Sequence, residues 1–498
     1  MTAHEAPLML SVSGARGIVG RTMTPEVAAA YAGAFGSFLR ATTGTARPRV
    51  VVGLDGRISG PPLASAAVGG LLATGCDVIE LGVAMTPTVG VMIGHHGADG
   101  GLAVTASHNP IEWNGIKCLD GDGLAPPPAV AKEIVDRFKE RRIDWCGPLE
   151  TGRATHDRSA ARVHVDRVLG QVDAGAIRPR GFTVVLDSVN GSGCEGGRML
   201  LEALGCRVIH LFGEPTGVFG HTPEPLAENL VDLARATGST PGAACGFAQD
   251  PDADRLAIVD ETGRFIGEEC TLVLAALRML QRTGGGTLAA NLSTSRMIDD
   301  VAARFPGSRV VRTAVGEANV VAGLRPAHGI LGGEGNGGVI LPGVCWVRDS
   351  LSAMALVLEL LAHEGKPLSA IVASLPRYAM IKRKMELAAV GGMAAVAPAL
   401  ARVKAAFAAE RVQHRTDRAR DRRGRDRGPR ERAVRPVPAR RRRVTWIARP
   451  RRRRAQRAPR AASRRAWKDA AAAAWPRPGS AASHSACRSR SDSSTVSV

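Results

Sequence analysis

Three segments of the chain repeat one order of apolar and polar positions. In each, a run of β-branched and apolar residues precedes a turn with Gly or Ser, an Ala/Leu-rich stretch and a second β-branched run; these segments are residues 50–82, 184–213 and 287–317. A β-branched run predicts a strand, and a helix that ends near Gly before another such run is typical of a βαβ unit. Copies at intervals of roughly 100–130 residues predict three similar α/β domains.

We place these α/β domains at residues 1–150, 151–257 and 258–370, because a chain of 498 residues is too long for one core. The predicted fold class is therefore α/β, with three α/β/α sandwich domains. Each sandwich carries its own sheet, and ligands of open α/β sheets bind at the carboxyl ends of the strands.

Residues 371–410 predict the start of a fourth, α+β domain. YAMIKRKMEL (378–387) has the composition of a strand, and GGMAAVAPALARVKAAFAAE (391–410) has that of an amphipathic helix. From residue 411 to 498 no periodic apolar face remains. Such a segment cannot offset the entropy of ordering, so we expect a disordered Arg-rich tail.

The tail also holds the charge of the chain. The net charge is +20, but residues 411–498 hold 28 Lys and Arg against 6 Asp and Glu, a net charge of +22, which leaves −2 for residues 1–410. Its basic residues are Arg except for Lys468, mixed with Ala, Pro and Ser. Three interpretations stay open: a shifted reading frame in GC-rich coding sequence, a genuine extension that binds nucleic acid or other polyanions, and an unrelated replacement domain.

The cysteines and apolar runs indicate a compartment. Nine cysteines are scattered with no C-x-x-C pair, which favours reduced thiols. No apolar run has the length of a membrane span, and the start MTAHEAPLML lacks the basic residues of a signal peptide. We expect a cytoplasmic protein that does not contact membranes. Nothing in the pattern indicates an oligomeric state.

The first candidate for chemistry is Ser107 in GGLAVTASHNP. GLAVTA predicts a buried strand and Asn-Pro a turn, so Ser107 follows the carboxyl end of a strand with His108 beside it. Such a serine is either a nucleophile or a turn residue that caps its own backbone. A nucleophile needs a base and groups that stabilise charge, which must come from elsewhere in the chain.

Asp250, Asp252 and Asp254 form the second candidate, between the predicted strands AACGFAQ and LAIVD. Three alternating carboxylates repel one another unless a cation lies among them, and hard oxygen ligands favour Mg²⁺ or Ca²⁺. A solvated acidic surface turn is the alternative. An EF-hand loop is excluded because its sixth position needs Gly and here holds Arg255. We therefore expect Mg²⁺ on a surface turn.

Three further stretches carry polar groups that could bind an anion or a sugar hydroxyl. Lys117 follows Ser107 by ten residues and could bring its ammonium over the serine, or could face solvent. Arg16 lies in the Gly-flanked stretch SVSGARGIVG, whose backbone can approach an anion. In GGEGNGG (332–338), Glu334 and Asn336 could bind sugar hydroxyls, with a flexible surface loop as the alternative.

Taken together, TASHNP, NGIK, DPDADR, SGARG and GEGNGG resemble the α-D-phosphohexomutases in order and spacing, from residue 9 to about 410. The resemblance implies three α/β domains and a smaller α+β domain around a central cleft. It also implies the following site: catalytic Ser107, His108, Lys117 and Arg16; Mg²⁺ on Ser107, Asp250, Asp252 and Asp254; substrate on Glu334, Asn336, Arg255 and Gly316.

The implied reaction is phosphoryl transfer through a phosphoserine. Ser107 would give its phosphoryl group to a hydroxyl of a sugar phosphate, and the bisphosphate would return its other phosphate, so that sugar 6-phosphate and 1-phosphate interconvert. Such transfer depends on in-line positioning and on neutralised oxygens, which Mg²⁺, Arg and Lys supply.

Two departures from the family pattern concern the substrate. Asn336 and Gly338 replace the Ser and His of G-E-x-S-G-H, and GEGNGG resembles phosphoglucosamine mutases, so glucosamine phosphate is expected, with glucose or mannose phosphate as the alternative. The phosphate-binding string R-x-S-[GN]-T-E of the fourth domain is missing. The alternative from another class is an inactive phosphosugar-fold protein whose tail binds polyanions.

Overall fold

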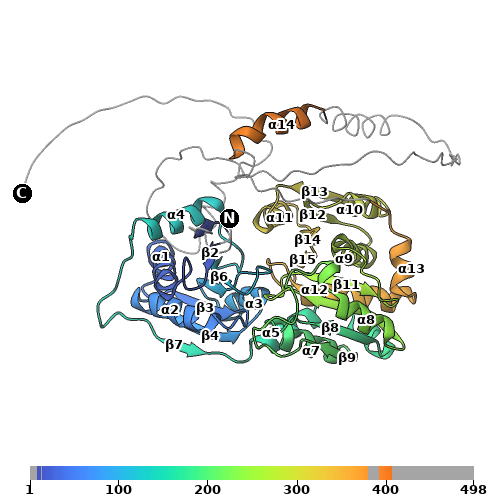
Figure 1. Cartoon of the computed structure of the whole chain (residues 1–498), viewed down its shortest axis with the longest axis horizontal. Coiled ribbons are helices and arrows are strands. Elements are labelled where there is room, and N and C mark those ends of the chain that lie inside the picture. The colour runs from blue at the N-terminus through green and yellow to red at the C-terminus, as the bar shows by residue number, and fades with distance from the viewer. Residues whose placement is uncertain (1–7, 13, 379–391, 407–498) are drawn as a thin grey trace, which may run out of the picture. The chain divides into compact units, whose positions relative to one another are not determined.

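The computed structural model describes residues 8–12, 14–378 and 392–406. Among these, the residues up to Pro376 belong to one compact unit, and Arg377, Tyr378 and Gly392–Ala406 belong to a second. The first unit contains three modules, each built on its own sheet (blue, green and yellow in Figure 1). The three α/β sandwich domains expected from the repeats are thus confirmed, while their boundaries at residues 150, 257 and 370 and the central cleft stay predictions.

The first module contains a seven-stranded sheet in the order β1-β2-β6-β5-β3-β4-β7. Helix α1 shows how local sequence sets an element: Thr24 accepts a hydrogen bond from the Val27 amide at its start, Pro25 is the first helical residue, and Gly44 ends it in the left-handed region. The elements are β1 (Met9–Ser11), β2 (Gly14–Ile18), α1 (Pro25–Thr43), β3 (Arg49–Leu54), α2 (Gly60–Ala73), β4 (Asp77–Val83), α3 (Thr86–His96), β5 (Gly100–Val104), β6 (Trp113–Asp120), α4 (Pro128–Lys139) and β7 (Ala154–His156).

The second module contains a four-stranded sheet in the order β11-β10-β8-β9. Its elements are α5 (Ala160–Leu169), α6 (Ala174–Ile177), β8 (Thr183–Asp187), α7 (Gly193–Ala203), β9 (Arg207–Leu211), α8 (Val231–Ser239), β10 (Ala243–Gln249) and β11 (Leu256–Asp260).

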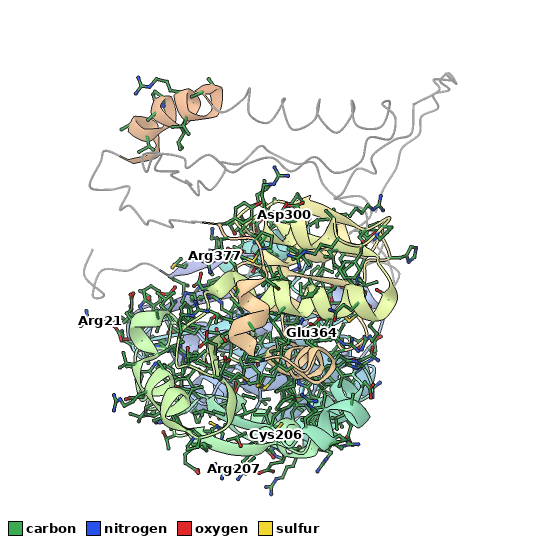
Figure 2. The ribbon with its side chains drawn as sticks, turned by 90° about the vertical axis from the view of Figure 1, so that its right-hand side faces the viewer. Arg21, Cys206, Arg207, Asp300, Glu364 and Arg377 are labelled. Atoms are coloured by element: carbon green, nitrogen blue, oxygen red, sulfur yellow. The ribbon has the colours of Figure 1, made fainter. Side chains whose placement is uncertain are left out.

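The third module contains a four-stranded sheet in the order β13-β12-β14-β15, which is the order of the second sheet read from its other edge. Its elements are α9 (Glu268–Thr283), β12 (Thr287–Asn291), α10 (Met297–Ala302), β13 (Arg309–Thr313), α11 (Glu317–Leu324), β14 (Leu331–Glu334), β15 (Gly338–Ile340), α12 (Ser350–Glu364) and α13 (Leu368–Ala373). Figure 2, turned by 90°, labels Arg21 of the first module, Cys206 of the second and Asp300 of the third at separate edges of the unit.

One topology underlies all three sheets. In each, two parallel strands are followed by a third parallel strand and an antiparallel fourth strand: β3, β4, β5 and β6 in the first module, β8 to β11 in the second, β12 to β15 in the third. The fourth strand is an edge strand in the second and third modules, whereas β6 pairs with β2 on its other side. The periodic pattern of the sequence is therefore a true structural repeat.

Helix α12 lies where the modules meet. Every side chain from Ser350 to Leu361 is buried, including Glu359, which pairs with Arg278 at 2.9 Å. Asp349 caps it by accepting hydrogen bonds from the amides of Leu351 and Ser352, both at 3.0 Å. Buried His164 of α5 joins this cap to the first module, since its ring nitrogens lie 3.3 Å from Asp349 Oδ2 and 2.9 Å from Thr88 Oγ1 of α3.

The second unit is described at Arg377, Tyr378 and one helix. α14 (Gly392–Ala406) matches the predicted amphipathic helix at 391–410 and contains Pro398. The predicted strand at 378–387 has only Tyr378 among the described residues, and the tail 411–498 lies outside them. Within the described part of the chain, no helix is long and apolar enough to cross a membrane.

Candidate functional site

Three loops in equivalent positions carry the main candidate residues. Each connects the third strand of the repeat to the antiparallel fourth strand: β5–β6 holds Ser107, β10–β11 holds Asp250 to Asp254, and β14–β15 follows Glu334. The repeat therefore places them at the same end of their sheets, the carboxyl end of parallel strands, where α/β proteins bind ligands.

Ser107 lies in this first loop with a φ of 53°, in the left-handed region that non-glycine residues rarely adopt. Its amide donates to Thr105 Oγ1 at 2.8 Å, which holds that turn. Its hydroxyl lies 3.3 Å from Asp250 Oδ2 and 3.3 Å from His108 Nδ1. The structure thus brings together three side chains that the sequence placed in two separate motifs.

Arg57, which sequence analysis missed, stabilises the serine loop through hydrogen bonds to its backbone. Its side chain is fully buried and donates to four backbone carbonyls of that segment, at distances from 2.5 to 3.1 Å; these belong to Ser107, Asn109, Pro110 and Trp113. Asp55 pairs with Arg57 Nε at 2.9 Å and accepts from Thr105 Oγ1 at 2.5 Å. The loop conformation therefore depends on one guanidinium.

The aspartate loop is buried, so the expected surface turn is wrong. Asp250 and Asp252 are 0% exposed and Asp254 is 1% exposed, because the first and third modules cover the loop. One oxygen from each lies within 4.8 Å of the other two. Thr86, at the first turn of α3, donates to Asp252 Oδ2 at 2.7 Å, and its amide donates to the Asp252 carbonyl. Ala253, with a φ of 53°, turns the chain between the carboxylates.

Two oxygens of this loop fit a cation. Asp252 Oδ1 and Asp254 Oδ1 are buried and accept no hydrogen bond from the described residues. Burial and the neighbouring Asp254 and Asp252 carboxylates raise the pKa of Asp250 well above its usual range. Buried carboxylates that repel one another and lack donors are the arrangement that a hard divalent ion would neutralise.

Lys117 of β6 lies on the aspartates rather than over the serine hydroxyl. Its ammonium is 2.6 Å from Asp252 Oδ2 and 3.4 Å from Asp254 Oδ2. Burial lowers the pKa of Lys117, but the two carboxylates outweigh it and the net shift is upward. Burial would raise the pKa of Asp252, yet Lys117 brings it below its usual range. A charged Lys117 can neutralise anions but cannot act as a base.

Arg16 and Arg255 supply further positive charge to the same loop. Arg16, on β2, is half-buried, and burial lowers its pKa although Asp252 and Asp254 act to raise it. The Arg255 amide donates to Asp250 Oδ1 at 3.1 Å, and Arg255 Nε lies 3.7 Å from Asp254 Oδ1. The structure thus gathers the predicted cations around the aspartates.

Arg348, a second residue that sequence analysis missed, joins the aspartate loop to the third module. Its guanidinium lies 2.5 Å from Asp254 Oδ2, 2.7 Å from Glu334 Oε2 and 3.0 Å from Glu317 Oε2. Burial would lower the pKa of Arg348, but these carboxylates raise it well above its usual range. The guanidinium therefore fixes the spacing between the aspartates and Glu334.

Glu334 is held on its other oxygen as well. Glu334 Oε1 accepts from Asn291 Nδ2 at 2.6 Å and from the Gly316 amide at 3.2 Å, so Gly316 lies next to Glu334 as part of this cluster. Asn336 instead accepts from the Gly338 amide of its own loop at 3.3 Å. A side chain at Gly337 would place its Cβ 2.4 Å from the Leu256 carbonyl, so this glycine allows the loop to pack on β11.

His108 has a carboxylate on its far side. Its Nε2 lies 3.8 Å from Glu224 Oε1, while Nδ1 faces the Ser107 hydroxyl. Glu224 belongs to the second module, and sequence analysis did not select it. The Ser107 hydroxyl, the His108 imidazole and the Glu224 carboxylate therefore form a row that extends from the first module to the second.

Weak signals for the missed residues exist in the sequence. Asp55 and Arg57 directly follow strand β3, and Asn291 ends β12, which is the first strand of its repeat. Polar residues at the ends of parallel strands are candidates for a site. Arg348 had no such signal, because it follows an irregular segment.

The sequence matches the family described as phosphoglucomutase/phosphomannomutase in three consecutive alpha/beta/alpha domains. Domain I matches residues 9–143, domain II matches residues 162–263, and domain III matches residues 268–378. These ranges correspond to the three modules in their order along the chain.

Individual proteins agree with this family match. A phosphoglucomutase/phosphomannomutase of Thermococcus kodakarensis is 39% identical over 378 residues, 74% of this chain and 81% of the relative. A probable phosphoglucosamine mutase of Methanopyrus kandleri is 39% identical over 375 residues, 75% of this chain and 80% of the relative.

A crystal structure also resembles this fold. It is a phosphoglucomutase/phosphomannomutase family protein of Burkholderia thailandensis, with a TM-score of 0.66 and 31% identity, and the similarity covers 74% of this chain and 81% of that one. The chain therefore belongs to the phosphoglucomutase/phosphomannomutase family, the α-D-phosphohexomutases, which are metal-dependent isomerases.

Proposed function

We propose that the protein interconverts the 6-phosphate and 1-phosphate of a hexosamine, with glucosamine phosphate as substrate, through a phosphoserine at Ser107 and a sugar bisphosphate. The observation that carries this proposal is the position of the Ser107 hydroxyl, 3.3 Å from Asp250 Oδ2 and 3.3 Å from His108 Nδ1. A nucleophilic oxygen beside buried carboxylates needs a cation, and the surrounding residues fit one.

Asp250, Asp252 and Asp254 would hold Mg²⁺ next to the oxygen of Ser107. All their ligand atoms are hard oxygens, and two of these accept no hydrogen bond from the described residues. When bound, Mg²⁺ would neutralise charge on the transferring phosphoryl group. Lys117 and Arg16 provide the fixed positive charge that the same oxygens need.

The transfer itself breaks the bond between phosphorus and Ser107 Oγ and forms one between phosphorus and a sugar hydroxyl oxygen. The leaving Oγ must gain a proton as the sugar hydroxyl loses one. His108 is placed to give that proton through Nδ1, and Glu224 Oε1 lies 3.8 Å from its opposite ring nitrogen. The reverse transfer uses the same groups in the opposite direction.

Glu334 would bind the sugar ring. Asn291, Gly316 and Arg348 all contact its carboxylate, so its oxygens have fixed positions. Asn336 and Gly316 would line the same pocket for the ring, and Arg255 would face the phosphate.

The identity of the sugar is a separate part of this proposal. The GEGNGG loop favours glucosamine phosphate, and a 39% identical relative carries that activity in its name. A relative of equal identity is named phosphoglucomutase/phosphomannomutase, which makes glucose or mannose phosphate the second candidate. Comparing kcat/KM for the three sugar phosphates decides between them.

Labelling tests the phosphoserine. Incubation with a hexose 1,6-bisphosphate should leave one phosphate on Ser107, and Ser107→Ala should abolish both labelling and mutase activity. Ser239→Ala is the matched control, because Ser239 is an exposed residue at the end of α8. Labelling that persists in Ser107→Ala would contradict the proposal.

A further inference from the structure

A second cluster of metal-ligating side chains lies at the far end of α3, away from the aspartates. His95 and His96 are the last two residues of the helix, and Asp157 follows strand β7. One ligand atom from each lies within 4.8 Å of the others. His96 Nε2 is 2.8 Å from Asp157 Oδ2, and the two imidazole rings are 5.0 Å apart between centroids.

The ligand atoms of this cluster differ in chemical type from those of the aspartate loop. Two imidazoles and one carboxylate are ligands that suit Zn²⁺ and similar transition metals, whereas Mg²⁺ prefers oxygen alone. Tetrahedral Zn²⁺ with bonds of about 2.0–2.1 Å separates its ligand atoms by roughly 3.4 Å. His96 Nε2 and Asp157 Oδ2 are 2.8 Å apart and all three ligand atoms lie within 4.8 Å of one another, so small side-chain rotations would bring them to that separation.

The surroundings also favour a cation. The other carboxylate oxygen of Asp157 accepts from the amide and the hydroxyl of Ser159, both at 2.7 Å, which fixes the carboxylate plane. The histidines belong to the last turn of a helix, where the partial negative charge of the helix dipole attracts positive ions. Exposure of His95 leaves an approach from solvent.

We propose that His95, His96 and Asp157 bind a divalent transition-metal ion, Zn²⁺ by preference, with a water as the fourth ligand. The ion would link α3 to the segment that runs from β7 to α5, and so would join the first module to the start of the second. The opposite end of α3 contacts Asp252 through Thr86. One helix of 11 residues therefore separates two metal sites of different chemistry.

Titration of the full chain with Zn²⁺, in excess Mg²⁺ to occupy the aspartates, tests the site. His95→Ala and Asp157→Asn should each lose one bound Zn²⁺ per chain, or weaken it by at least about 10-fold, and Ser159→Ala should weaken it by about 10-fold. His363→Ala is the matched control, since His363 also lies in the last turn of a helix with one aspartate, Asp173, at 3.6 Å.

Two further readouts separate binding from misfolding. The melting temperature of the wild type should rise with Zn²⁺ and that of His95→Ala should not, while their melting temperatures without metal should agree. Co²⁺ should give the absorption bands of a four-coordinate ion in the wild type and in Asp252→Asn. Equal Zn²⁺ stoichiometry and affinity in wild type and His95→Ala would overturn the proposal.

Discussion

Arg57 Nη2 lies 2.5 Å from the carbonyl oxygen of Ser107, and the same guanidinium contacts three further carbonyls of the serine loop. Ser107 has a left-handed backbone that other turn conformations would avoid. A single buried cation therefore maintains an unfavourable turn that aims the hydroxyl at Asp250.

Replacing Arg57 should reduce turnover more than substrate binding. Arg57→Lys keeps the charge but cannot donate to four carbonyls and Asp55 at once, so the Ser107 hydroxyl should shift. We expect kcat to fall by about 10²-fold with a smaller change in KM, because misplacement by about 1 Å has that effect. Steady-state kinetics and the rate of Ser107 phosphorylation measure it. Arg47→Lys, at a half-exposed pair with Asp77, is the control; equal effects of the two would contradict this account.

Replacing Arg348 should weaken both metal binding at the aspartates and sugar binding at Glu334. Arg348→Lys cannot contact Asp254, Glu334 and Glu317 together, so we expect kcat/KM to fall by about 10²-fold and the Mg²⁺ requirement to rise. Arg348→Ala would remove the ion-pair partner of Glu317 and one of the partners of Asp254 and of Glu334, and should be destabilised by roughly 3–5 kcal/mol. Arg325→Lys, at the exposed pair with Asp122, should change neither activity nor stability strongly.

Asp252→Asn should abolish metal-dependent activity without unfolding the protein. An amide oxygen can still accept from Thr86 and Lys117, while its nitrogen occupies the position of an oxygen that has no donor. We expect activity to fall by at least about 10²-fold, and chelation of the wild type to have the same effect. Circular dichroism checks the fold. Activity of the wild type that survives chelation would show that the aspartates hold no essential metal.

Stability should depend on pH through Asp120, the last residue of β6. Burial raises the pKa of Asp120 to about 7 in the folded protein, against about 3.9 in an unfolded chain. The folded state therefore prefers the neutral acid, and stability falls as pH rises from about 4 through 7. Asp120→Asn removes this titration, and its amide oxygen can still accept from the Leu124 amide. The free energy of unfolding of Asp120→Asn minus that of the wild type should therefore be larger at pH 8 than at pH 4, by on the order of a few kcal/mol.

Melting temperatures at pH 5 and pH 8 test that expectation. The difference between Asp120→Asn and the wild type should grow with pH, whereas Asp122→Asn, half-exposed beside Arg325, should show no such growth. A difference that stays constant between the two pH values would mean that Asp120 does not titrate in this range.

Deleting residues 411–498 should change mutase activity little. The deletion removes a net charge of +22, and a segment of this charge is expected to bind polyanions by counterion release rather than a single phosphosugar. We expect the deletion to abolish salt-dependent DNA or RNA binding. A chain that carries an R-x-S-[GN]-T-E loop in place of this segment should turn over faster by orders of magnitude. Full activity that disappears on deletion would show that the segment takes part in catalysis.

The repeat was predictable because its signals are local. β-branched runs, Gly and Ser turns and helix ends recur in each segment, and the three sheets follow them. Ser107 and the aspartates could be selected for the same reason, since each follows a largely apolar strand.

The contacts of the site were not predictable, because they join residues far apart in the chain. Arg57 contacts carbonyls about 50 residues away, and a backbone carbonyl leaves no mark in a sequence pattern. Asp254 and Arg348 are 94 residues apart. The aspartate loop was expected at the surface because its composition is that of a turn, whereas packing of neighbouring modules buries it.

The position of His164 affects how the first and third modules can move relative to each other. It contacts Thr88 of the first module and Asp349 of the third, so any hinge movement between these two modules must break a buried contact and leave a polar group unpaired, at about 1–3 kcal/mol. Asp349 precedes α12 and follows Arg348 directly. A force that pulls one module away from the others is therefore transmitted along this path to the guanidinium that spaces the aspartates from Glu334.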